Sequence, residues 1–252
     1  MIYLNQNQII SKKIKNQTTI DFLIHSPLIA SEAKPGQFVT IKCGAEHLLR
    51  RPISICDVEG DNIRIIFEVR GKGTEYLASL NVGDKMDILG PLGNGFTLIP
   101  PDKKVLLVGG GIGTYPLFFT SKHYKNPYLA VGFRNKELIY LTDDFENHGT
   151  LVHISTDDGS FGKAGFVTGI VEEILENEKI DMIYTCGPAP MMREIVALSD
   201  KLNVACQVSL EERMACGMGA CVGCSCKLSG EKTDYARVCK DGPCFDKTQV
   251  II

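Results

Sequence analysis

Six of the ten cysteines in this chain crowd into residues 216–252, and this crowding constrains the fold more strongly than any other feature of the sequence. The other four, which are Cys43, Cys56, Cys186 and Cys206, are single and stand in apolar, strand-like contexts. Thiols in a reducing cytosol seldom pair into disulfides, so cysteines gathered in this way are typical of metal ligation. The same segment is rich in glycine and has little periodicity. We therefore expect a metal centre, rather than an apolar core, to organise it.

The spacing of the crowded cysteines indicates which centre this is. Cys216, Cys221 and Cys224 form a C-x4-C-x2-C run, and Cys239 follows it. This is the spacing of plant-type [2Fe-2S] proteins, and its glycines would let backbone N–H groups face the sulfurs while the distant cysteine binds the second iron. The alternative is a four-cysteine zinc site, but such sites normally have two C-x2-C pairs and this chain has one. The pattern favours an iron–sulfur cluster on these four positions and leaves the other two cysteines of the group as packed thiols.

The composition excludes several classes of protein. With 44% hydrophobic and 23% charged residues the chain has the make-up of an ordinary globular protein. Its formal net charge of -3 and scattered Lys and Arg residues offer no basic stripe for nucleic acid. Apolar runs such as 105–108 are the size of strands, whereas a membrane-spanning helix needs about 20 apolar residues. The amino-terminal segment has no apolar signal core, so we expect no membrane association and a cytoplasmic location.

Short runs of alternating apolar and polar residues, separated by Pro, Gly and Asp turns, fill the first part of the chain. They cover residues 8–15, 19–25, 37–43, 62–70 and 85–89. Segments such as 34–38 and 81–84 supply the turn chemistry between them. Alternation of this kind predicts antiparallel strands, and we expect residues 1–97 to form a small β-barrel.

After the Pro100-Pro101 break the pattern changes to apolar strands that alternate with helical stretches. The strands are expected at 104–108, 128–132, 151–155, 182–186 and 204–210, and the clearest helices at 166–177 and 189–202. Strands and helices in alternation predict a parallel, doubly wound α/β sheet. The sequence therefore predicts a barrel domain at 1–97, an α/β domain at 98–208 and a small cluster domain at 209–252.

Two strand ends in the α/β part carry candidate binding motifs. Residues 105–113 run from a strand into a G-G-G-x-G turn, whose glycines are Gly109, Gly110, Gly111 and Gly113. Such glycines let the backbone approach a pyrophosphate, although a turn of this kind can also be only a tight connection. At the second strand end, Cys186-Gly187-Pro188 leads into a helix, and taken alone it is more simply a helix start with proline. Because ligands bind at the carboxyl ends of parallel strands, both ends are candidates for a dinucleotide site.

A third motif lies in the barrel region. Arg51-Pro52-Ile53-Ser54 precedes the turn Gly71-Lys72-Gly73-Thr74 along the chain. A guanidinium and a hydroxyl within one extended tetrapeptide suit a ligand that has both a phosphate and a hydrogen-bonding ring. Strings of this kind are more often plain surface turns, so this motif gains meaning only beside the others.

In their order along the chain, these motifs resemble those of the ferredoxin–NADP reductase superfamily. The order is a β-barrel with R-P-I-S and G-K-G-T, then G-G-G-I-G, then C-G-P-A-P-M-M and the cysteine run. Within the superfamily, residues 210–221 and 237–243 resemble the electron-transfer subunits of type B dihydroorotate dehydrogenases. The resemblance covers essentially the whole chain.

This resemblance implies FAD, a [2Fe-2S] cluster and NAD as cofactors. It implies that Arg51 pairs with the FAD pyrophosphate and that Ser54 hydrogen-bonds the isoalloxazine ring. Gly73 and Thr74 would cradle the FAD phosphates. The rest of the FAD site would comprise Pro52, Ile53, Glu68, Val69 and Arg70. The NAD site would comprise Gly109, Gly110, Gly111, Gly113, Cys186, Gly187 and Pro188, and the cluster ligands would be Cys216, Cys221, Cys224 and Cys239.

The functional expectation follows from what these cofactors carry. A nicotinamide exchanges a hydride, a [2Fe-2S] cluster exchanges single electrons, and a flavin can do both. The five histidines stand in no catalytic pattern, so chemistry on an organic substrate should occur on another chain. The resemblance implies an FMN-containing dihydroorotate dehydrogenase catalytic subunit as partner, two copies of each chain in a heterotetramer, and electron flow from FMN through the cluster and FAD to NAD+ in pyrimidine biosynthesis.

Two other functions fit the same motifs. The chain would also suit another NAD(P)H-linked complex, such as a sulfide dehydrogenase or a bifurcating ferredoxin:NADP oxidoreductase. A redox-sensing regulator, in which FAD and the cluster report the state of the cell, is the alternative outside the enzymes. The candidate nicotinamide-binding motifs of the chain argue against a role as a regulator.

Overall fold

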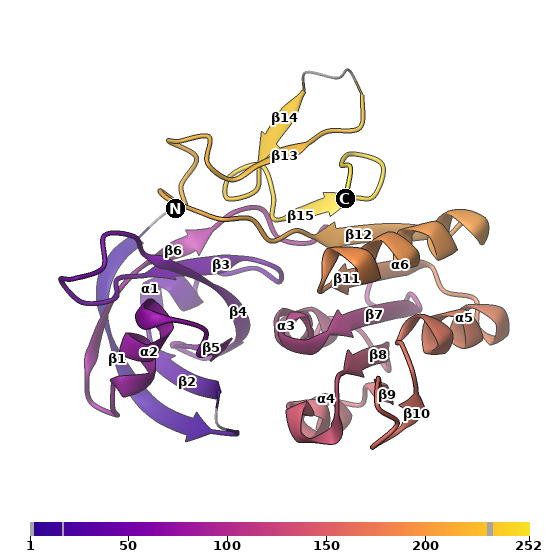
Figure 1. The fold of residues 1–252 in the computed structure, drawn as a ribbon, viewed down its shortest axis with the longest axis horizontal. Helices are drawn as coiled ribbons and strands as arrows, with labels where there is room; N and C mark the ends of the chain where they lie inside the picture. Colours follow the sequence, from indigo (N-terminus) through magenta and orange to yellow (C-terminus); the bar gives the residue numbers. More distant parts are fainter. Residues whose placement is uncertain (1–2, 17, 231–233) are drawn as a thin grey trace. The chain divides into compact units, whose positions relative to one another are not determined.

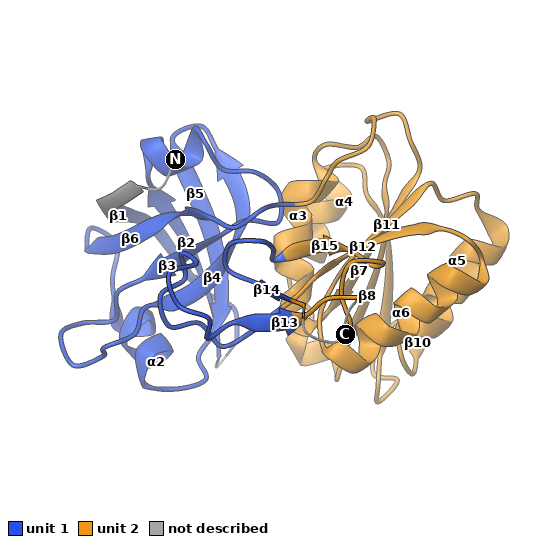
Figure 2. Ribbon diagram, turned by 90° about the horizontal axis from the view of Figure 1, so that it is seen from above, with its two compact units in different colours: residues 1–95, 211–226, 235–243 blue, residues 96–210, 227–234, 244–252 orange. Residues whose placement is uncertain are grey.

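The computed structural model describes residues 3–16, 18–230 and 234–252 (Figure 1). Its residues divide into two compact units (Figure 2). The barrel unit comprises Met1–Gly95, Glu211–Cys226 and Tyr235–Pro243, and the sheet unit comprises Phe96–Leu210, Lys227–Asp234 and Cys244–Ile252. The first boundary lies close to the one expected after residue 97. By this grouping, the cysteine-rich segment expected at 209–252 contributes to both units, and its standing as a domain stays a prediction.

Six antiparallel strands close the barrel in the order β1-β2-β5-β4-β3-β6, which confirms the predicted fold of this part. They are β1 Tyr3–Ile14, β2 Thr19–His25, β3 Phe38–Ile41, β4 Arg51–Glu59, β5 Asn62–Glu68 and β6 Lys85–Leu92. Branched and aromatic side chains such as Phe22, Ile24 and Ile65 are fully buried in its core, as their alternation along the strands requires. Two helices, α1 Pro27–Ala30 and α2 Lys72–Ser79, complete this part of the unit.

Two elements of the barrel unit, strand β4 and helix α2, were not predicted from the sequence pattern. The R-P-I-S tetrapeptide is the start of the nine-residue strand β4. The turn expected at the G-K-G-T string is the beginning of helix α2, because Thr74 Oγ1 accepts hydrogen bonds from the N–H groups of Arg70 and Gly71 at 2.9 and 3.1 Å. The turns predicted at 34–38 and 81–84 are present, with Gly36 and Gly83 at φ of 87° and 95°.

Seven strands form the sheet of the second unit, in the order β10-β9-β8-β7-β11-β12-β15 (Figure 1). They are β7 Val105–Gly110, β8 Tyr128–Phe133, β9 Leu151–Thr156, β10 Lys163–Ala164, β11 Met182–Cys186, β12 Ala205–Ser209 and β15 Cys244–Asp246. Every neighbouring pair is parallel except β12 and β15, which run antiparallel. The parallel strands confirm the predicted α/β fold. Strand β15 comes from the cysteine-rich end, where the sequence pattern predicts no strand.

Helices between these strands bury apolar stripes. They are α3 Tyr115–Ser121, α4 Thr142–Asn147, α5 Thr168–Asn177 and α6 Ala189–Lys201, with 3-10 turns η1 Gly111–Thr114 and η2 Lys136–Leu138. The helices expected at 166–177 and 189–202 are therefore α5 and α6. Helix α5 buries Ile170, Val171 and Ile174, a spacing that places them on one face. The short strands β13 Ser225–Lys227 and β14 Tyr235–Arg237 pair with each other.

The segment that enters the sheet unit is fixed by buried hydroxyl groups. The Ile99 N–H donates to the hydroxyl oxygens of Tyr124 and Tyr184, which lie 2.7 Å apart. The Thr97 carbonyl accepts from Tyr184 Oη at 3.1 Å and from Gln207 Nε2 at 2.8 Å. Since Tyr184 and Gln207 belong to β11 and β12, this network fastens the entering segment to the centre of the sheet.

Candidate functional site

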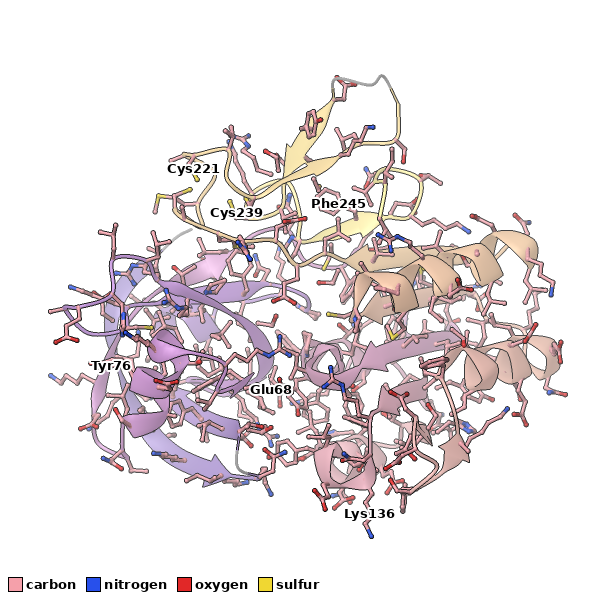
Figure 3. All side chains as sticks on the ribbon, viewed as in Figure 1. Glu68, Tyr76, Lys136, Cys221, Cys239 and Phe245 are labelled. Atoms are coloured by element: carbon pink, nitrogen blue, oxygen red, sulfur yellow. The ribbon has the colours of Figure 1, made fainter. Side chains whose placement is uncertain are left out.

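The cluster loop, residues 216–224, belongs to the barrel unit together with Cys239, so all four candidate ligands lie in one unit. Figure 3 labels two of these ligands, Cys221 and Cys239. Gly217 has φ of +69°, and a Cβ added to it would lie 2.8 Å from Thr40 Cγ2 of strand β3. Gly219 has φ of +81°, and its added Cβ would lie 2.5 Å from Lys240 Cδ. Left-handed backbone and close neighbours both require glycine at these two positions. The glycines thus let the loop follow a tight path over the barrel.

Backbone N–H groups of this region point at cysteine sulfurs, as the sequence predicts. The Cys221 N–H donates to Cys216 Sγ at 3.3 Å, and the Cys239 N–H donates to Cys224 Sγ at 3.4 Å. The Gly219 N–H donates to Cys239 Sγ at 3.1 Å. The cysteines are therefore associated as two pairs, Cys216 with Cys221 and Cys224 with Cys239.

Two pairs suit a two-iron cluster better than a single metal ion. Among the described residues, no three His, Cys, Asp or Glu side chains are placed to hold one metal ion. A structural zinc ion needs four ligands converging on one point. In a [2Fe-2S] cluster with four cysteine ligands, two cysteines bind each iron, and the two pairs found here fit that division.

The pKa values of these thiols also support a two-iron cluster at this place. Burial opposes ionisation of Cys216, but hydrogen bonds from the Cys221, Met218 and Ala220 N–H groups and from the Cys221 side chain lower its pKa to about 6. Burial, with the neighbouring Cys224 sulfur, raises the pKa of Cys239 to about 12. Four thiolates this close together therefore need positive charge between them, which the two irons would provide.

The two cysteines left over from the cluster pattern are both buried, and their role as packed thiols stays a prediction. Cys226 lies in β13 and Cys244 in β15, and both are buried. Burial raises the pKa of Cys226, and it raises that of Cys244 well above its ordinary value. Cys244 lies opposite Ser209 in the pairing of β15 with β12, so it is part of the sheet.

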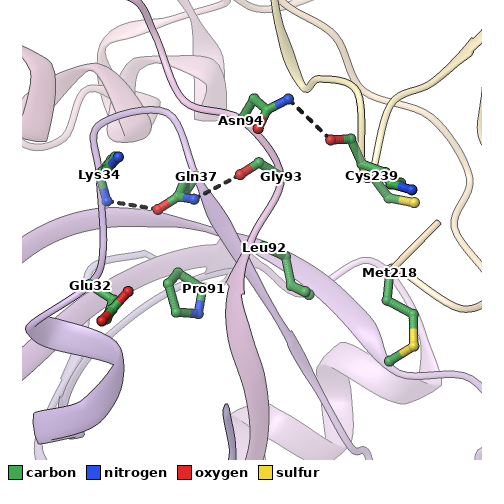
Figure 4. Close-up of a pocket in the computed structure, with 10 residues that line it drawn as sticks. Glu32, Lys34, Gln37, Pro91, Leu92, Gly93, Asn94, Met218 and Cys239 are labelled. Carbon is green, nitrogen blue, oxygen red and sulfur yellow. Dashed lines mark hydrogen bonds between the residues drawn. The ribbon is translucent and has the colours of Figure 1, made fainter. Parts of the chain in front are cut away.

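A pocket of about 280 Å³ opens beside the cluster loop in the barrel unit (Figure 4). Met218 and Cys239 form one side of it, and Lys34 and Lys240 also line it. Gln37 organises the opposite wall, because its side chain accepts from the Lys34 N–H at 2.8 Å and donates to the Gly93 carbonyl at 2.7 Å. One of the candidate cluster ligands therefore borders this pocket.

The candidate FAD residues of the barrel unit come together in space. A Cβ added to Gly73 would lie 2.3 Å from Arg51 Nε, so the R-P-I-S and G-K-G-T strings touch. The strings are 20 residues apart in the sequence, and strand β4 and helix α2 bring them into contact. Arg51 Nη1 donates to the Leu49 carbonyl at 2.6 Å, which orients the guanidinium.

The remaining FAD candidates flank this contact. Pro52, Ile53 and Ser54 continue β4 and pair with β3, and the Ser54 side chain is exposed. Glu68 ends β5 and forms an ion pair with Arg70 at 2.8 Å. The Val69 N–H donates to the Thr18 carbonyl at 2.7 Å. The hydroxyl of Thr74 caps α2, so its side chain shapes the start of that helix.

The two candidate NAD motifs also meet, at the carboxyl edge of the sheet. Strands β7 and β11 are parallel neighbours, with Gly109 opposite Cys186. A Cβ added to Gly113 would lie 2.3 Å from the Cys186 carbonyl oxygen, and one on Gly110 would lie 2.7 Å from Pro188 Cδ. The strand order reverses between β7 and β11, and this crevice is where open α/β sheets bind ligands.

Two loops at the same edge were not singled out from the sequence. The loop after β8 and the loop after β9 are joined by a hydrogen bond from the Lys136 N–H to Ser160 Oγ at 2.9 Å. Gly162 has φ of +65°, and its added Cβ would lie 2.1 Å from the Ile154 carbonyl oxygen. Glycines that follow a strand at residues 159 and 162 were the signal in the sequence for this second loop.

Comparison with known proteins identifies the family. The sequence model described as the iron–sulfur cluster binding domain of dihydroorotate dehydrogenase B matches residues 211–251. The electron transfer subunit of dihydroorotate dehydrogenase B (NAD(+)) from Geobacillus kaustophilus is 40% identical over the full length of both chains. The subunit of that name from Caldanaerobacter subterraneus subsp. tengcongensis is 44% identical over 86% of this chain and 87% of its own. The chain belongs to the electron transfer subunits of dihydroorotate dehydrogenase B.

Solved structures agree with this placement. A structure of an NADH-dependent reduced ferredoxin-NADP oxidoreductase matches 98% of this electron transfer subunit and 90% of its own chain, with a TM-score of 0.88 and 32% identity. A cytochrome P450 reductase matches 80% of the subunit and 66% of its own chain with a TM-score of 0.68 and 21% identity, which shows the fold.

These matches confirm the predicted class of function. The subunit is an electron-transferring component of an oxidoreductase, with FAD, a [2Fe-2S] cluster and NAD as its cofactors, and a catalytic subunit is its partner. The sulfide dehydrogenase, ferredoxin:NADP oxidoreductase and regulator alternatives are set aside by the full-length relatives. No helix among the described residues is long and apolar enough to cross a membrane.

Proposed function

We propose that this electron transfer subunit works with an FMN-containing catalytic subunit, two copies of each, and passes electrons from that FMN to NAD+. Dihydroorotate would be oxidised on the catalytic subunit. Electrons would then cross the [2Fe-2S] cluster and FAD of this chain before reaching the nicotinamide. The pairing of the four cysteines carries this proposal, because a two-iron site is what links a flavin to a one-electron path. The cytoplasmic location stays a prediction.

The proposed cluster ligands are Cys216, Cys221, Cys224 and Cys239. Their sulfurs accept hydrogen bonds from backbone N–H groups, which stabilise negative charge on ligand sulfurs. Their thiols resist ionising together, as the raised pKa of Cys239 indicates. Both features support a metal cluster at this place, and the relatives' cluster-binding segment covers all four positions.

The proposed FAD site centres on the contact between Arg51 and Gly73. A guanidinium beside a helix start offers a charge and N–H donors to a pyrophosphate. The exposed Ser54 hydroxyl, three residues along β4, is free to bond a flavin ring, and the segment from Glu68 to Arg70 leads into helix α2, which contains Gly73. Pro52 and Ile53 hold the strand between them in register with β3.

The proposed NAD site is the crevice between the ends of β7 and β11. Gly109, Gly110, Gly111 and Gly113 supply a turn that the dinucleotide phosphates can approach closely. The facing wall comprises Cys186, Gly187 and Pro188. Their contacts with Gly110 and Gly113 support a single site made of both motifs.

Replacement of Cys221 by Ser tests the cluster assignment. We expect this variant to lose the [2Fe-2S] signal and electron delivery to the catalytic subunit, and to retain most NADH-to-dye activity, since FAD and NAD use other residues. Iron content, absorption spectra and the two activities are the measurements. Cys226→Ser, which alters a buried thiol outside the proposed ligand set, should keep the cluster. Equal loss of both activities in Cys221→Ser would contradict separate sites, and stoichiometric zinc in the parent chain would contradict the cluster.

A further inference from the structure

Arg237 reaches from the strand before Cys239 to the cluster loop. Its Nη1 donates to the Gly219 carbonyl oxygen at 2.8 Å. Asp241 anchors it, because Asp241 Oδ2 accepts from the Arg237 backbone N–H at 2.8 Å and from its Nε at 3.3 Å. The side chains of Arg237 and Asp241 are 33% and 39% exposed, so neither is forced into place by burial. The guanidinium is held instead by hydrogen bonds on both sides.

The carbonyl that Arg237 holds belongs to the peptide between Gly219 and Ala220, one residue before the cluster cysteine Cys221. A peptide is planar and moves as one unit, so fixing its carbonyl fixes the direction in which the chain enters Cys221. The Cys221 N–H donates to Cys216 Sγ at 3.3 Å. A guanidinium bonded to the Gly219 carbonyl therefore helps to aim the Cys221 N–H at Cys216.

The neighbouring peptide is constrained through the same glycine. The Gly219 N–H donates to Cys239 Sγ at 3.1 Å, and Gly219 has a left-handed φ of +81°. Lys240 closes the other side, since a Cβ on Gly219 would lie 2.5 Å from Lys240 Cδ. Gly219 thus connects the two cysteine pairs, and Arg237 sets its orientation.

We propose that Arg237, oriented by Asp241, is a positioning residue that aims the N–H groups of Gly219 and Cys221 at one sulfur of each cysteine pair and so raises the reduction potential of the cluster. Adding one electron places more negative charge on the cysteine sulfurs, and N–H donors stabilise that reduced state more than the oxidised state. The inference rests on the proposed cluster site at these cysteines.

The positive charge of Arg237 by itself also favours reduction of the cluster. A variant of Asp241 distinguishes this effect of charge from the effect of orientation. Removing the arginine lowers the potential by either route. Removing the Asp241 carboxylate takes away a negative charge, which by itself would raise the potential. If the carboxylate acts by orienting Arg237, its removal lowers the potential instead. The sign of the shift in Asp241→Ala therefore distinguishes the two.

The experiment is a redox titration of the full chain, loaded with FAD and cluster and followed by the EPR signal of the reduced [2Fe-2S] centre. For Arg237→Gln we expect the reduced-to-oxidised ratio at a fixed ambient potential to fall about tenfold, which is a shift of about 59 mV for one electron. Asp241→Ala should shift in the same direction. Arg213→Gln is the matched control, because Arg213 is an exposed arginine three residues before Cys216. It should change the ratio less than about threefold, a shift of less than about 28 mV by the same constant.

A raised or unchanged potential in Asp241→Ala would overturn the inference, as would equal shifts in Arg237→Gln and Arg213→Gln. If Asp241→Ala does not retain the cluster, Asp241→Asn is titrated under the same criterion of sign. Resonance Raman spectra give a second measurement: the deuterium shift of the iron–sulfur stretching bands should shrink in Arg237→Gln. Absence of any EPR signal from the parent chain would refute the cluster assignment itself, whereas an intact cluster with an unmoved potential would refute only the role of Arg237.

Discussion

A buried ion pair joins the neighbouring strands β2 and β5 of the barrel. Arg64 Nε and Nη2 donate to the two carboxylate oxygens of Asp21 at 2.7–3.2 Å, and their side chains are only 8% and 4% exposed. Removing the carboxylate of such a pair takes away charge-assisted hydrogen bonds at a buried site, where water cannot replace them. Asp21→Asn should therefore lower the free energy of unfolding by about 3 kcal/mol, measured by urea denaturation.

A second ion pair of the barrel unit provides the comparison for this variant. Arg50 and Asp87 meet at 2.7 Å, but their side chains are 23% and 34% exposed. Water screens this pair, so Asp87→Asn should cost about 1 kcal/mol or less. Similar losses in the two variants would show that burial does not govern the stabilisation by these charges.

At the scale of elements, the ends of β7 and β11 depend on the absence of a side chain at Gly113. An added methyl group would stand 2.3 Å from the Cys186 carbonyl oxygen, where ordinary contact begins at 3.4 Å. Gly113→Ala must therefore push the start of η1 away from β11. We expect at least about tenfold weaker NADH binding, which is about 1.4 kcal/mol, by fluorescence titration. Gly169→Ala in α5, where the added Cβ meets only Lys163 at 3.9 Å, should bind NADH normally.

The loops that follow β8 and β9 predict a preference for NADH over NADPH. Arg134 and Lys136 are exposed, while Asp158 lies on the facing loop, with its N–H bonded to the Arg134 carbonyl at 3.3 Å. Hydrogen bonds from the Ser160 hydroxyl and N–H lower the pKa of Asp158, so its carboxylate is charged at neutral pH. A negative charge on the loop that faces these cations disfavours a 2′-phosphate. We expect at least about tenfold higher kcat/KM with NADH, or about 1.4 kcal/mol, and a higher value with NADPH would refute this.

At the scale of the whole molecule, the chain should depend on its partner for chemistry on an organic substrate. The five histidines stand in no catalytic pattern along the sequence, and the proposed sites hold cofactors only. The isolated, cofactor-loaded chain should reduce dyes with NADH and show no dihydroorotate oxidation. Adding the FMN subunit from the same organism should create dihydroorotate:NAD+ activity.

The assembly itself is measured by the mass of the reconstituted complex in solution. Two copies of each chain are expected. The exposed Met218 and Val222 on the cluster loop, 44% and 75% accessible, are suited to approach by a partner because electron transfer requires short distances. If no dihydroorotate-oxidising subunit from the same organism binds the loaded chain, the proposed complex is refuted, while the cluster and flavin sites keep their separate tests.

Much of the fold was predictable because local patterns carry it. The alternating residues of β2 and β5 and the apolar runs of β7 and β11 matched their observed strands within a few residues. Elements without such periods were missed: α2 begins in a G-K-G-T string that resembles a turn, and its start depends on the Thr74 hydroxyl. Strand β15 is only three residues long and forms because β12 offers it an edge. A pattern of three residues cannot show such long-range pairing.

By itself the sequence determined the cluster chemistry, since the C-x4-C-x2-C spacing and its glycines are local, and it determined the order of the binding motifs. Only the tertiary structure decided which motifs share a site. Arg51 meets Gly73, and Gly113 meets Cys186, because strand pairing and helix packing bring together residues far apart in the chain. The hydrogen bond from Arg237 to the Gly219 carbonyl likewise joins residues that are separated in the sequence. Such contacts depend on the path of the backbone in space, which residue spacing along a chain does not encode.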